Sequence, residues 1–370
     1  MSNLATTQPG VKLWNQLNLS GNACISPLSI QLAMAMVYLG ADGDTKKQIA
    51  KELGFPEDEK LTSNIDWTLK TISSTIWAKS PTKYNVANRL FGRDTFKFKE
   101  PFLKLTAEKF NAELQAMDFT NQTATASTIN KWIEEQTNSK IKDLITPDSI
   151  TSATTLILVN ALYLKAAWAE QFKKAQTKPE PFTNADGKEK LVSTMNKVET
   201  YGYATSDGTT YVSLPLEDGF SFNIIMPDNS STTITEEMLE KTNDLAFTSL
   251  ALHLPKFKIE GEAIQLGKAM QALGITEAFD VPKGTANFDT IATRLPDDYL
   301  AIGDVVHKTF VDVNEDGVEA AAATAVMMVR CACFHPEPDP VEVKINKPFY
   351  FTIDHHASKT CLFLGRVTEL

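Results

Sequence analysis

Two cysteines and a histidine near the C-terminal end have the types and spacing that could bind a soft metal ion or undergo oxidation. Cys331, Cys333 and His335 alternate along the chain. In an extended segment alternate side chains lie on one side, so two thiols and an imidazole could ligate a soft metal or act as a redox site. Our first expectation is that the protein needs no metal and no cofactor, and a redox- or metal-responsive site at these residues is the alternative.

Residue patterns that carry enzyme chemistry are otherwise absent from the sequence. It contains no GxSxG, HExxH, GxxxxGK[ST] or GxGxxG motif. Its five histidines show no other metal-binding spacing. These motifs place nucleophiles, metal ligands or phosphate-binding backbone, so their absence argues against the common hydrolase, metalloprotease and nucleotide-binding classes. We therefore expect that the protein is not an enzyme.

The most informative segment is an alanine run that follows the residues Glu315-Asp316-Gly317-Val318-Glu319. Before it, residues 305–313 are rich in β-branched and aromatic side chains, which predicts a strand. Alanine favours helix, but no amphipathic pattern accompanies the run. We interpret the segment as a long loop fed by a strand, and a flexible linker or a helix is the alternative.

This arrangement resembles the proximal hinge and reactive-centre loop of the serpins, a family of protease inhibitors. The family pattern is Glu, any residue, Gly, a small residue, Glu, and then small residues ending in Thr-Ala. One departure is Val318, where the family usually has Thr or Ser. The resemblance implies a loop at about 315–340 that is cleaved as bait and then inserts as a new strand into the central sheet. The matching residues are Glu315, Gly317, Val318, Glu319, Ala320, Ala321, Ala322, Ala323, Thr324 and Ala325.

Small side chains meet the physical demands of such an insertion. Alternate side chains of the new strand must fit under covering helices, where large or charged groups would clash or be buried unpaired. Gly317 provides backbone freedom at the hinge. We expect Glu315 and Glu319 to point to the solvated face of the forming strand. We also expect arginine at Ala321 or Ala323 to block insertion.

Two peptide bonds are candidates for cleavage. The family usually places the bond seventeen residues along from the first hinge glutamate, which gives Cys331-Ala332 and suits elastase-like or chymotrypsin-like pockets. Arg330-Cys331 offers a cation for a trypsin-like pocket. The sequence leaves both open. The partner implied by the resemblance is a target protease held as a covalent acyl complex, with a serine protease expected and a cysteine protease as the alternative.

The resemblance also implies residues that hold the central sheet closed. Ser26 and Pro27 predict a helix start before an apolar run that ends at Gly40, and this helix matches the family's buried helix behind the sheet. By that match Ser26 and Ser29 are shutter residues. Asn160, in an apolar strand-like run, needs a hydrogen-bond partner that His307 could supply. Trp168 corresponds to the position where the loop first enters the sheet.

The fold expected from the resemblance is the α+β serpin fold, with three β-sheets, about eight or nine helices and an exposed reactive-centre loop. A length of 370 residues alone would suggest two domains. No Gly/Ser/Pro-rich linker interrupts the middle of the chain, and helix-like segments give way to strand-like ones. We therefore expect one domain over residues 1–370, and a monomer.

Charge and hydropathy limit the partners. A formal net charge of −10 opposes nucleic-acid binding, which requires clustered cations. Residues 65–83, where some serpins bind polyanions, carry only Lys70, Lys79 and Lys83, so we expect no heparin-type activator. No apolar run is long enough to span a membrane. The N-terminus lacks a secretory-signal pattern and four cysteines are no disulfide framework, so we expect a cytoplasmic location, with secretion after removal of a leader or by unconventional export as the alternative.

Within the resemblance two functions compete. A suicide-substrate inhibitor of proteases is expected, because the hinge carries small residues. A non-inhibitory chaperone, carrier or storage protein is the alternative, and such members typically have bulky, charged or proline residues in the hinge. Pro336, Pro338 and Pro340 alternate with acidic residues after the loop and predict an extended acidic strip.

Overall fold

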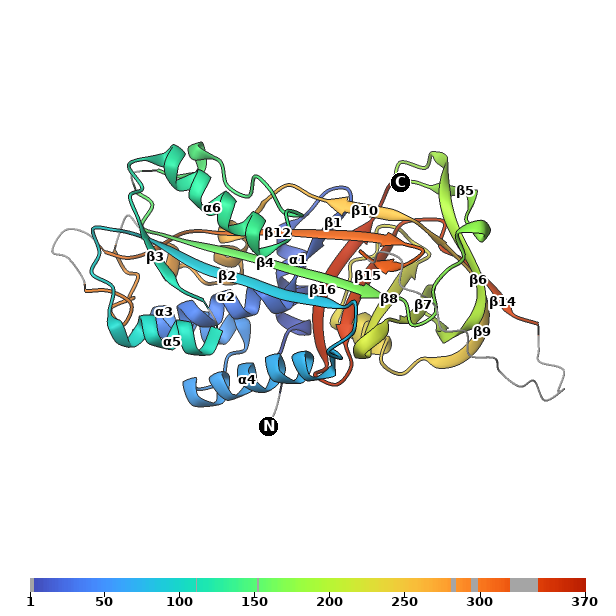
Figure 1. Ribbon diagram of the computed structural model, residues 1–370, viewed down its shortest axis with the longest axis horizontal. Coiled ribbons are helices and arrows are strands. Elements are labelled where there is room, and N and C mark those ends of the chain that lie inside the picture. The colour runs from blue at the N-terminus through green and yellow to red at the C-terminus, as the bar shows by residue number, and fades with distance from the viewer. Residues whose placement is uncertain (1–2, 111, 152, 281–283, 294–298, 320–338) are drawn as a thin grey trace.

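The computed structural model describes residues 3–110, 112–151, 153–280, 284–293, 299–319 and 339–370 (Figure 1). Within this part of the chain eight α-helices combine with two large sheets, in agreement with the expected α+β class and helix number. The helices are α1 (Thr7–Leu17), α2 (Pro27–Gly40), α3 (Gly43–Leu53), α4 (Asp58–Thr75), α5 (Glu100–Phe110), α6 (Gln122–Gln136), α7 (Glu236–Lys241) and α8 (Gly267–Leu273).

The main sheet has seven strands, and its long central members run along the molecule (Figure 1). Its two longest strands, β4 (Leu156–Ala167) and β12 (Ile302–Asn314), are parallel neighbours. The other strands are β2 (Lys83–Arg93), β3 (Leu114–Met117), β10 (Phe257–Glu260), β11 (Ile264–Gln265) and β13 (Gly317–Val318).

The second sheet has nine strands, where we expected two separate sheets. They join because β6 (Glu189–Ser206), at 18 residues, pairs with β9 (Ala246–Pro255) over residues 194–203 and with β7 (Thr209–Pro215) over residues 202–206. Within the described residues the three expected sheets therefore form two hydrogen-bonded networks. The remaining strands are β1 (Ala23–Ile25), β5 (Lys178–Thr183), β8 (Phe220–Pro227), β14 (Val341–Lys344), β15 (Phe349–His355) and β16 (Thr360–Val367).

Helix α2 is buried on all sides, and its predicted ends are confirmed. Ser26 caps it by accepting a hydrogen bond from the backbone N–H of Ser29, Pro27 occupies the first turn, and Gly40 is its last residue. A Cβ at Gly40 would lie 2.3 Å from Ile291 Cγ1, so the close packing there requires glycine. The helix lies between the main sheet and the second sheet and packs against β4 and β16.

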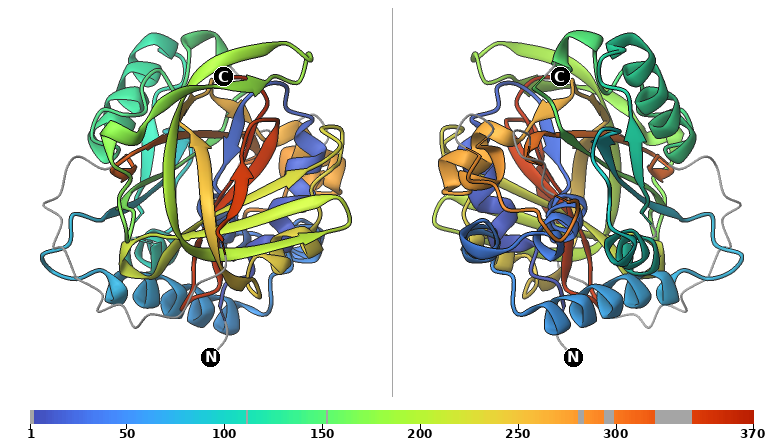
Figure 2. Two further views of the ribbon diagram at one scale, coloured as in Figure 1. Left: turned by 90° about the vertical axis from the view of Figure 1, so that its right-hand side faces the viewer. Right: turned by 90° about the vertical axis from the view of Figure 1, so that its left-hand side faces the viewer.

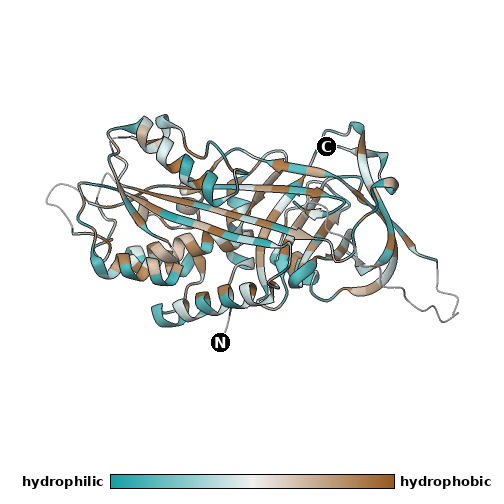
Figure 3. Cartoon of the chain, viewed as in Figure 1, coloured by the Kyte–Doolittle hydropathy of each residue, from teal (hydrophilic) through white to brown (hydrophobic). Residues whose placement is uncertain are grey.

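Helix α6 covers the opposite face of the main sheet (Figure 2). Its Ile129 and Ile133 pack with Ile157 and Val159 of β4, whereas Leu158 on the same strand belongs to the core that includes α2. Successive side chains of a strand point to opposite faces, so β4 is apolar on both. Outer helices such as α4 instead alternate polar and apolar residues, as the hydropathy colouring shows (Figure 3).

Candidate functional site

The central strands β4 and β12 are paired directly over only part of their length. Seven residue pairs, from Ile302 with Leu156 to Thr309 with Leu162, form a parallel ladder. Beyond Thr309, β12 pairs on its far side with β10, and β4 pairs on its far side with β2. The C-terminal parts of the two strands, after Thr309 and Leu162, are thus not paired with each other.

Residues expected to form the hinge lie between the C-terminal ends of β4 and β12. Gly317 and Val318 make the short strand β13, which pairs antiparallel with Ala167 and Ala166 of β4. On its other edge β13 pairs antiparallel with Asn314 and Val313 of β12. Val318 is 1% exposed. The start of the expected loop is therefore a strand of the main sheet, and valine fits its buried position.

Gly317 is required by close packing as well as by backbone conformation. Its φ is +144°, a value that side-chain-bearing residues rarely adopt. A Cβ at this position would lie 2.3 Å from the carbonyl oxygen of Ala166 and 2.7 Å from Cα of Ala167. The sequence predicted backbone freedom at Gly317, and the structure adds that the strand β4 passes too close for any side chain.

The two hinge glutamates are not on a solvated face in this structure, whereas our expectation concerns the strand that forms on insertion and stays a prediction. The side chain of Glu315 is 6% exposed, and its carboxylate lies 2.9 Å from Lys256 Nζ and accepts a 2.7 Å hydrogen bond from Thr177. Burial alone would raise the pKa of Glu315, but hydrogen bonds from Lys256 and Thr177 outweigh it and the pKa is lowered. Lys256 and Thr177 therefore hold the Glu315 side chain in place in its ionised form.

Glu319 is also enclosed, because the chain turns at this residue with a φ of +52°. Its side chain is 8% exposed and lies 2.9 Å from Lys140 Nζ. Burial raises its pKa despite this partner, and Oε2 has no hydrogen-bond partner among the described residues. The expected outward orientation would hold only in a regular strand, which this residue does not form here.

Trp168 lies beside β13, where the sequence placed the entry of the loop. Its indole N–H donates to the carbonyl of Asn314 at 2.8 Å, and its backbone N–H donates to that of Asp316 at 3.2 Å. The ring contacts Phe172 and Phe222 edge-to-face. Trp168 therefore holds the turn between β12 and β13 in place.

The predicted residues Ser26, Ser29, Asn160 and His307 meet in one buried cluster between α2, β4 and β12. Nδ2 of Asn160 donates to Ser29 Oγ and to the side-chain oxygen of Asn88, each at 2.6 Å. The side-chain oxygen of Asn160 contacts Nδ1 of His307 at 2.5 Å. Sequence reasoning missed Asn88, although an amide within the strand-like run 87–92 is a signal of the same kind as Asn160. We call these five residues the Asn160 cluster.

Hydrogen bonding determines the tautomer of His307. The backbone N–H of Ser26 can only donate, and it lies 2.9 Å from Nε2 of His307. The proton of the neutral ring is therefore on Nδ1 and is donated to Asn160. Burial lowers the pKa of His307 to about 3, so the ring is neutral at physiological pH. Every polar group of His307 and Asn160 has a partner, which is what the low polarity of the site demands.

Comparison with known proteins agrees with this arrangement. The family model described as "Serpin (serine protease inhibitor)" matches residues 4–370. The chain belongs to the serpin family. It is 36% identical to the leukocyte elastase inhibitor of Xenopus tropicalis, over 96% of this chain and 95% of that protein. It is 34% identical to human neuroserpin, over 96% of this chain and 89% of that protein.

Solved serpin structures have the same fold. Serpin48 from the insect Tenebrio molitor superposes with a TM-score of 0.84 at 28% identity, over 98% of this chain and 95% of that one. The thermophilic serpin tengpin in its native state gives a TM-score of 0.86 at 27% identity, over 99% and 93% of the two chains. The predicted serpin fold is confirmed.

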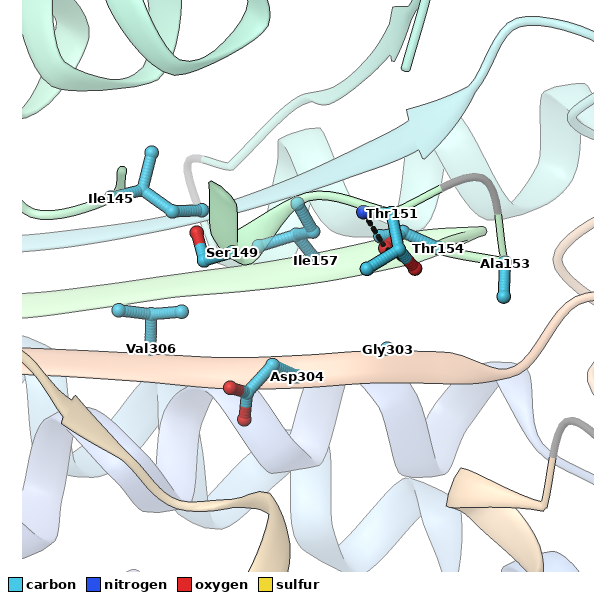
Figure 4. Close-up of a pocket in the computed structure, with 9 residues that line it drawn as sticks. All are labelled: Ile145, Ser149, Thr151, Ala153, Thr154, Ile157, Gly303, Asp304 and Val306. Atoms are coloured by element: carbon cyan, nitrogen blue, oxygen red, sulfur yellow. Dashed lines mark hydrogen bonds between the residues drawn. The ribbon is translucent and has the colours of Figure 1, made fainter. Parts of the chain in front are cut away.

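A cavity of about 210 Å³ lies at the N-terminal end of the paired strands β4 and β12 (Figure 4). Its lining includes Ile157 of β4 and Gly303 and Val306 of β12, with Ser149 and Thr151 from the connection before β4. The register of the two strands also shifts between Ile302 and Asp304. In this serpin the direct pairing of β4 and β12 is therefore bounded by β13 at one end and by an irregular, hollow region at the other.

Several predicted residues of this serpin lie outside the described residues. These are the hinge positions Ala320 to Ala325, both candidate bonds at Arg330, Cys331 and Ala332, and the alternative site of Cys331, Cys333 and His335. In the part of the chain with defined coordinates, no group of His, Cys, Asp and Glu side chains could hold a metal ion. None of the described helices is both long and apolar enough to cross a membrane.

Proposed function

We propose that this serpin inhibits serine proteases as a suicide substrate, by inserting its cleaved loop between β4 and β12. The observation that carries the proposal is β13, which already lies between these strands and is antiparallel to both. A strand that continued from β13 would replace one parallel ladder with two antiparallel ones. Antiparallel pairing is slightly more stable per residue, so the geometry favours insertion.

The chemical step belongs to the protease. Its serine attacks the carbonyl of the residue before the scissile bond, the C–N bond breaks, and the new N-terminus leaves with the C-terminal fragment. The protease remains attached as an acyl-enzyme to the residues that continue from Glu319. Insertion of these residues would carry the protease along the sheet before water can release it.

The Asn160 cluster is proposed as the element that keeps the sheet closed until cleavage. Insertion past Thr309 must separate the seven pairs of the β4–β12 ladder, including Asn160 with His307. Some ten new ladder hydrogen bonds and buried side chains would stabilise the inserted form by on the order of 10 kcal/mol. That gain is comparable to the stability of a whole domain, so the uncleaved form would be kinetically trapped.

The target class follows from the bond that is cleaved, for which two positions remain candidates. Cys331 before the bond fits elastase-like or chymotrypsin-like pockets, and the similarity to leukocyte elastase inhibitors supports this choice. Arg330 before the bond fits trypsin-like proteases, whose pockets hold a carboxylate. A cysteine protease, which also forms an acyl-enzyme, is the alternative partner class.

Incubation with a panel of elastase-, chymotrypsin- and trypsin-like proteases tests the proposal. We expect a complex with one of these classes that survives denaturing electrophoresis, because the acyl bond is covalent. Sequencing the released C-terminal peptide would identify the bond as Arg330-Cys331 or Cys331-Ala332. Cleavage of the loop by every class without a stable complex would overturn inhibition and favour a non-inhibitory carrier or storage role.

A further inference from the structure

The chain leaves the main sheet at Glu319, although the strands on both sides of it, β4 and β12, continue. The backbone N–H of Glu319 donates to the carbonyl of Asp312 on β12 at 2.7 Å, which extends the register of β13 by one residue. The φ of Glu319 is +52°, however, whereas a strand requires a φ of about −140°. A glutamate rarely adopts the left-handed region, so contacts around its side chain must stabilise the turn.

Two side chains hold the carboxylate of Glu319 in this turn. Lys140 Nζ lies 2.9 Å from Oε1, and the hydroxyl of Tyr163 on β4 donates to the same oxygen at 3.4 Å. The ammonium group of Lys140 also lies 5.2 Å from the ring centre of Phe310 on β12. Because the side chain of Glu319 is 8% exposed, solvent screens this ion pair less than it screens a surface pair. The turned hinge is thus held between Lys140 and the two central strands.

Lys140 belongs to the connection after α6, and the backbone of this connection is fixed on both sides of it. The N–H of Lys140 donates to the carbonyl of Thr137 at 3.0 Å. Ser139, before it, has a left-handed φ of +59° and donates to the carbonyl of Glu134 at 2.8 Å. Ile141, after it, is 1% exposed and packs with α6 in the same buried cluster. Lys140 is thus presented to the hinge by a fixed segment, which lowers the entropy cost of the contact.

The contact with Lys140 is specific to the turned hinge. A strand that continued past β13 needs an extended Glu319, and the change in φ is a rotation about its N–Cα bond. The amide of Glu319 is already paired with Asp312, so this rotation moves Cβ while the amide stays in place. The carboxylate then leaves its present position beside Lys140 and Tyr163. Insertion therefore has to break this contact.

We propose that Lys140 is a positioning residue that holds Glu319 in the turned conformation and thereby slows entry of the cleaved loop into the sheet. The effect on loop entry rests on the proposed function, whereas the hold on the hinge does not. The contact is present before insertion and is lost as Glu319 straightens, so it stabilises the starting state more than the transition state. Removing the ammonium group should therefore speed insertion.

The hinge itself is tested by hydrogen–deuterium exchange on the intact protein, without any protease. In Lys140→Ala we expect the amides of β13 and Glu319 to exchange about threefold faster, because the hinge opens more often. The ion pair uses one carboxylate oxygen and a lysine side chain that is 39% exposed, so the effect should not be larger. The strand β16 monitors global opening, and its exchange should not change. Unchanged or slower exchange at β13 would overturn the proposal.

Further variants separate the role of Lys140 from that of its surroundings. Lys142→Ala is the matched control, because Lys142 is an exposed lysine of the same connection and its loss changes the net charge equally. Lys140→Arg keeps a cation beside Glu319 and should exchange like the wild type. In a Glu319→Gln background, Lys140→Ala should have little further effect, since Lys140 acts through the carboxylate. A full effect in that background would show that Lys140 acts through another residue and would contradict the assignment.

The products of a protease reaction separate this proposal from the inhibitory function. Insertion competes with hydrolysis of the acyl-enzyme, so a protease that yields both products with the wild type reports the relative rate of insertion. Lys140→Ala should raise the ratio of stable complex to cleaved serpin about threefold, whereas Lys142→Ala and Lys140→Arg should match the wild type. If no protease forms a complex, inhibition fails and hydrogen exchange still decides the role of Lys140. If complexes form and the ratios for Lys140→Ala and Lys142→Ala are equal, inhibition stands and the positioning role is wrong.

Discussion

His307 and Asn160 join the two central strands of the main sheet through buried polar atoms. Each belongs to a different central strand, and each is fully satisfied only while β4 and β12 remain paired. Ser26 and Ser29, at the start of α2, supply the remaining partners from behind the sheet. The cost of separating these groups would help to trap the uncleaved form in the proposed mechanism, because leaving buried donors and acceptors unpaired is unfavourable.

Replacing Asn160 with alanine should therefore destabilise the uncleaved protein. Asn160→Ala leaves Nδ1–H of His307 and the side-chain oxygen of Asn88 without their main partner, at a cost of about 2 to 3 kcal/mol. We expect a lower thermal unfolding temperature, measured by circular dichroism. The control is Asn229→Ala, at an exposed position. Similar unfolding temperatures for the two variants would show that the cluster contributes little.

His307 also makes stability depend on pH. The unfolded chain binds a proton near pH 6.5, whereas the folded protein resists protonation of His307 until about pH 3. The unfolded state thus binds more protons in this window, and the stability that neutral His307 provides is lost as pH falls from 6.5 toward 3.

The variant His307→Gln isolates this effect, because glutamine does not titrate. Between pH 7 and pH 5, urea unfolding of the uncleaved wild type should lose about 2 kcal/mol more than the variant. Asp354, whose pKa burial raises to about 6, acts in the opposite direction but is common to both proteins. Equal losses in the two proteins would mean that His307 is protonated near its ordinary pKa in the fold.

The strand β13 decides which loop positions face the interior of the sheet. Val318 is buried, and side chains two residues apart in a strand share a face. A strand continuing from β13 would place Ala320, Ala322 and Thr324 on the same face as Val318. Our expectation from sequence concerned Ala321 and Ala323, which would share the face of Glu319 in such a strand. A regular continuation of β13 would instead make Ala320, Ala322 and Thr324 the most sensitive positions.

Arginine substitutions distinguish the two faces. Ala322→Arg should turn the inhibitor into a substrate, because a large cation would have to enter the core behind the sheet. Ala321→Arg is the matched control and should retain most of the inhibition. The measurement is the ratio of stable complex to cleaved serpin on denaturing gels. Stronger loss in Ala321→Arg than in Ala322→Arg would contradict the continuation of β13 in register.

In the molecule as a whole, the two central strands of the main sheet are paired with each other up to Thr309 and are separated after it. Its central ladder is parallel, and antiparallel pairing with an additional strand is available on both facing edges. Under the proposed mechanism, a protein built in this way would gain stability by inserting a strand. The free energy for inhibition would then be stored in the uncleaved fold.

Cleavage of the loop should release that free energy. Limited proteolysis between residues 326 and 340 should give a nicked protein that unfolds about 13 °C above the intact one, as a gain on the order of 10 kcal/mol implies for a chain of this size. Differential scanning calorimetry of intact and nicked protein measures the shift. Equal unfolding temperatures would show that no strand is gained, and the insertion mechanism would be wrong.

The resemblance of residues Glu315 to Ala325 to the serpin hinge indicated the family, and the family model over residues 4–370 confirmed it. Local signals also located the buried helix from Pro27 to Gly40. The rule that a buried amide must be satisfied indicated that Asn160 needs a partner, and the serpin resemblance implied that this partner is His307, which the structure places there.

Tertiary structure alone decided how the hinge sits. That Glu315 and Glu319 are enclosed depends on Lys256, Thr177 and Lys140, which lie far away in sequence. The role of Asn88 and the joining of two expected sheets through β6 likewise depend on strand order and length. Contacts between distant segments are set by packing of the whole chain, and no local pattern records them.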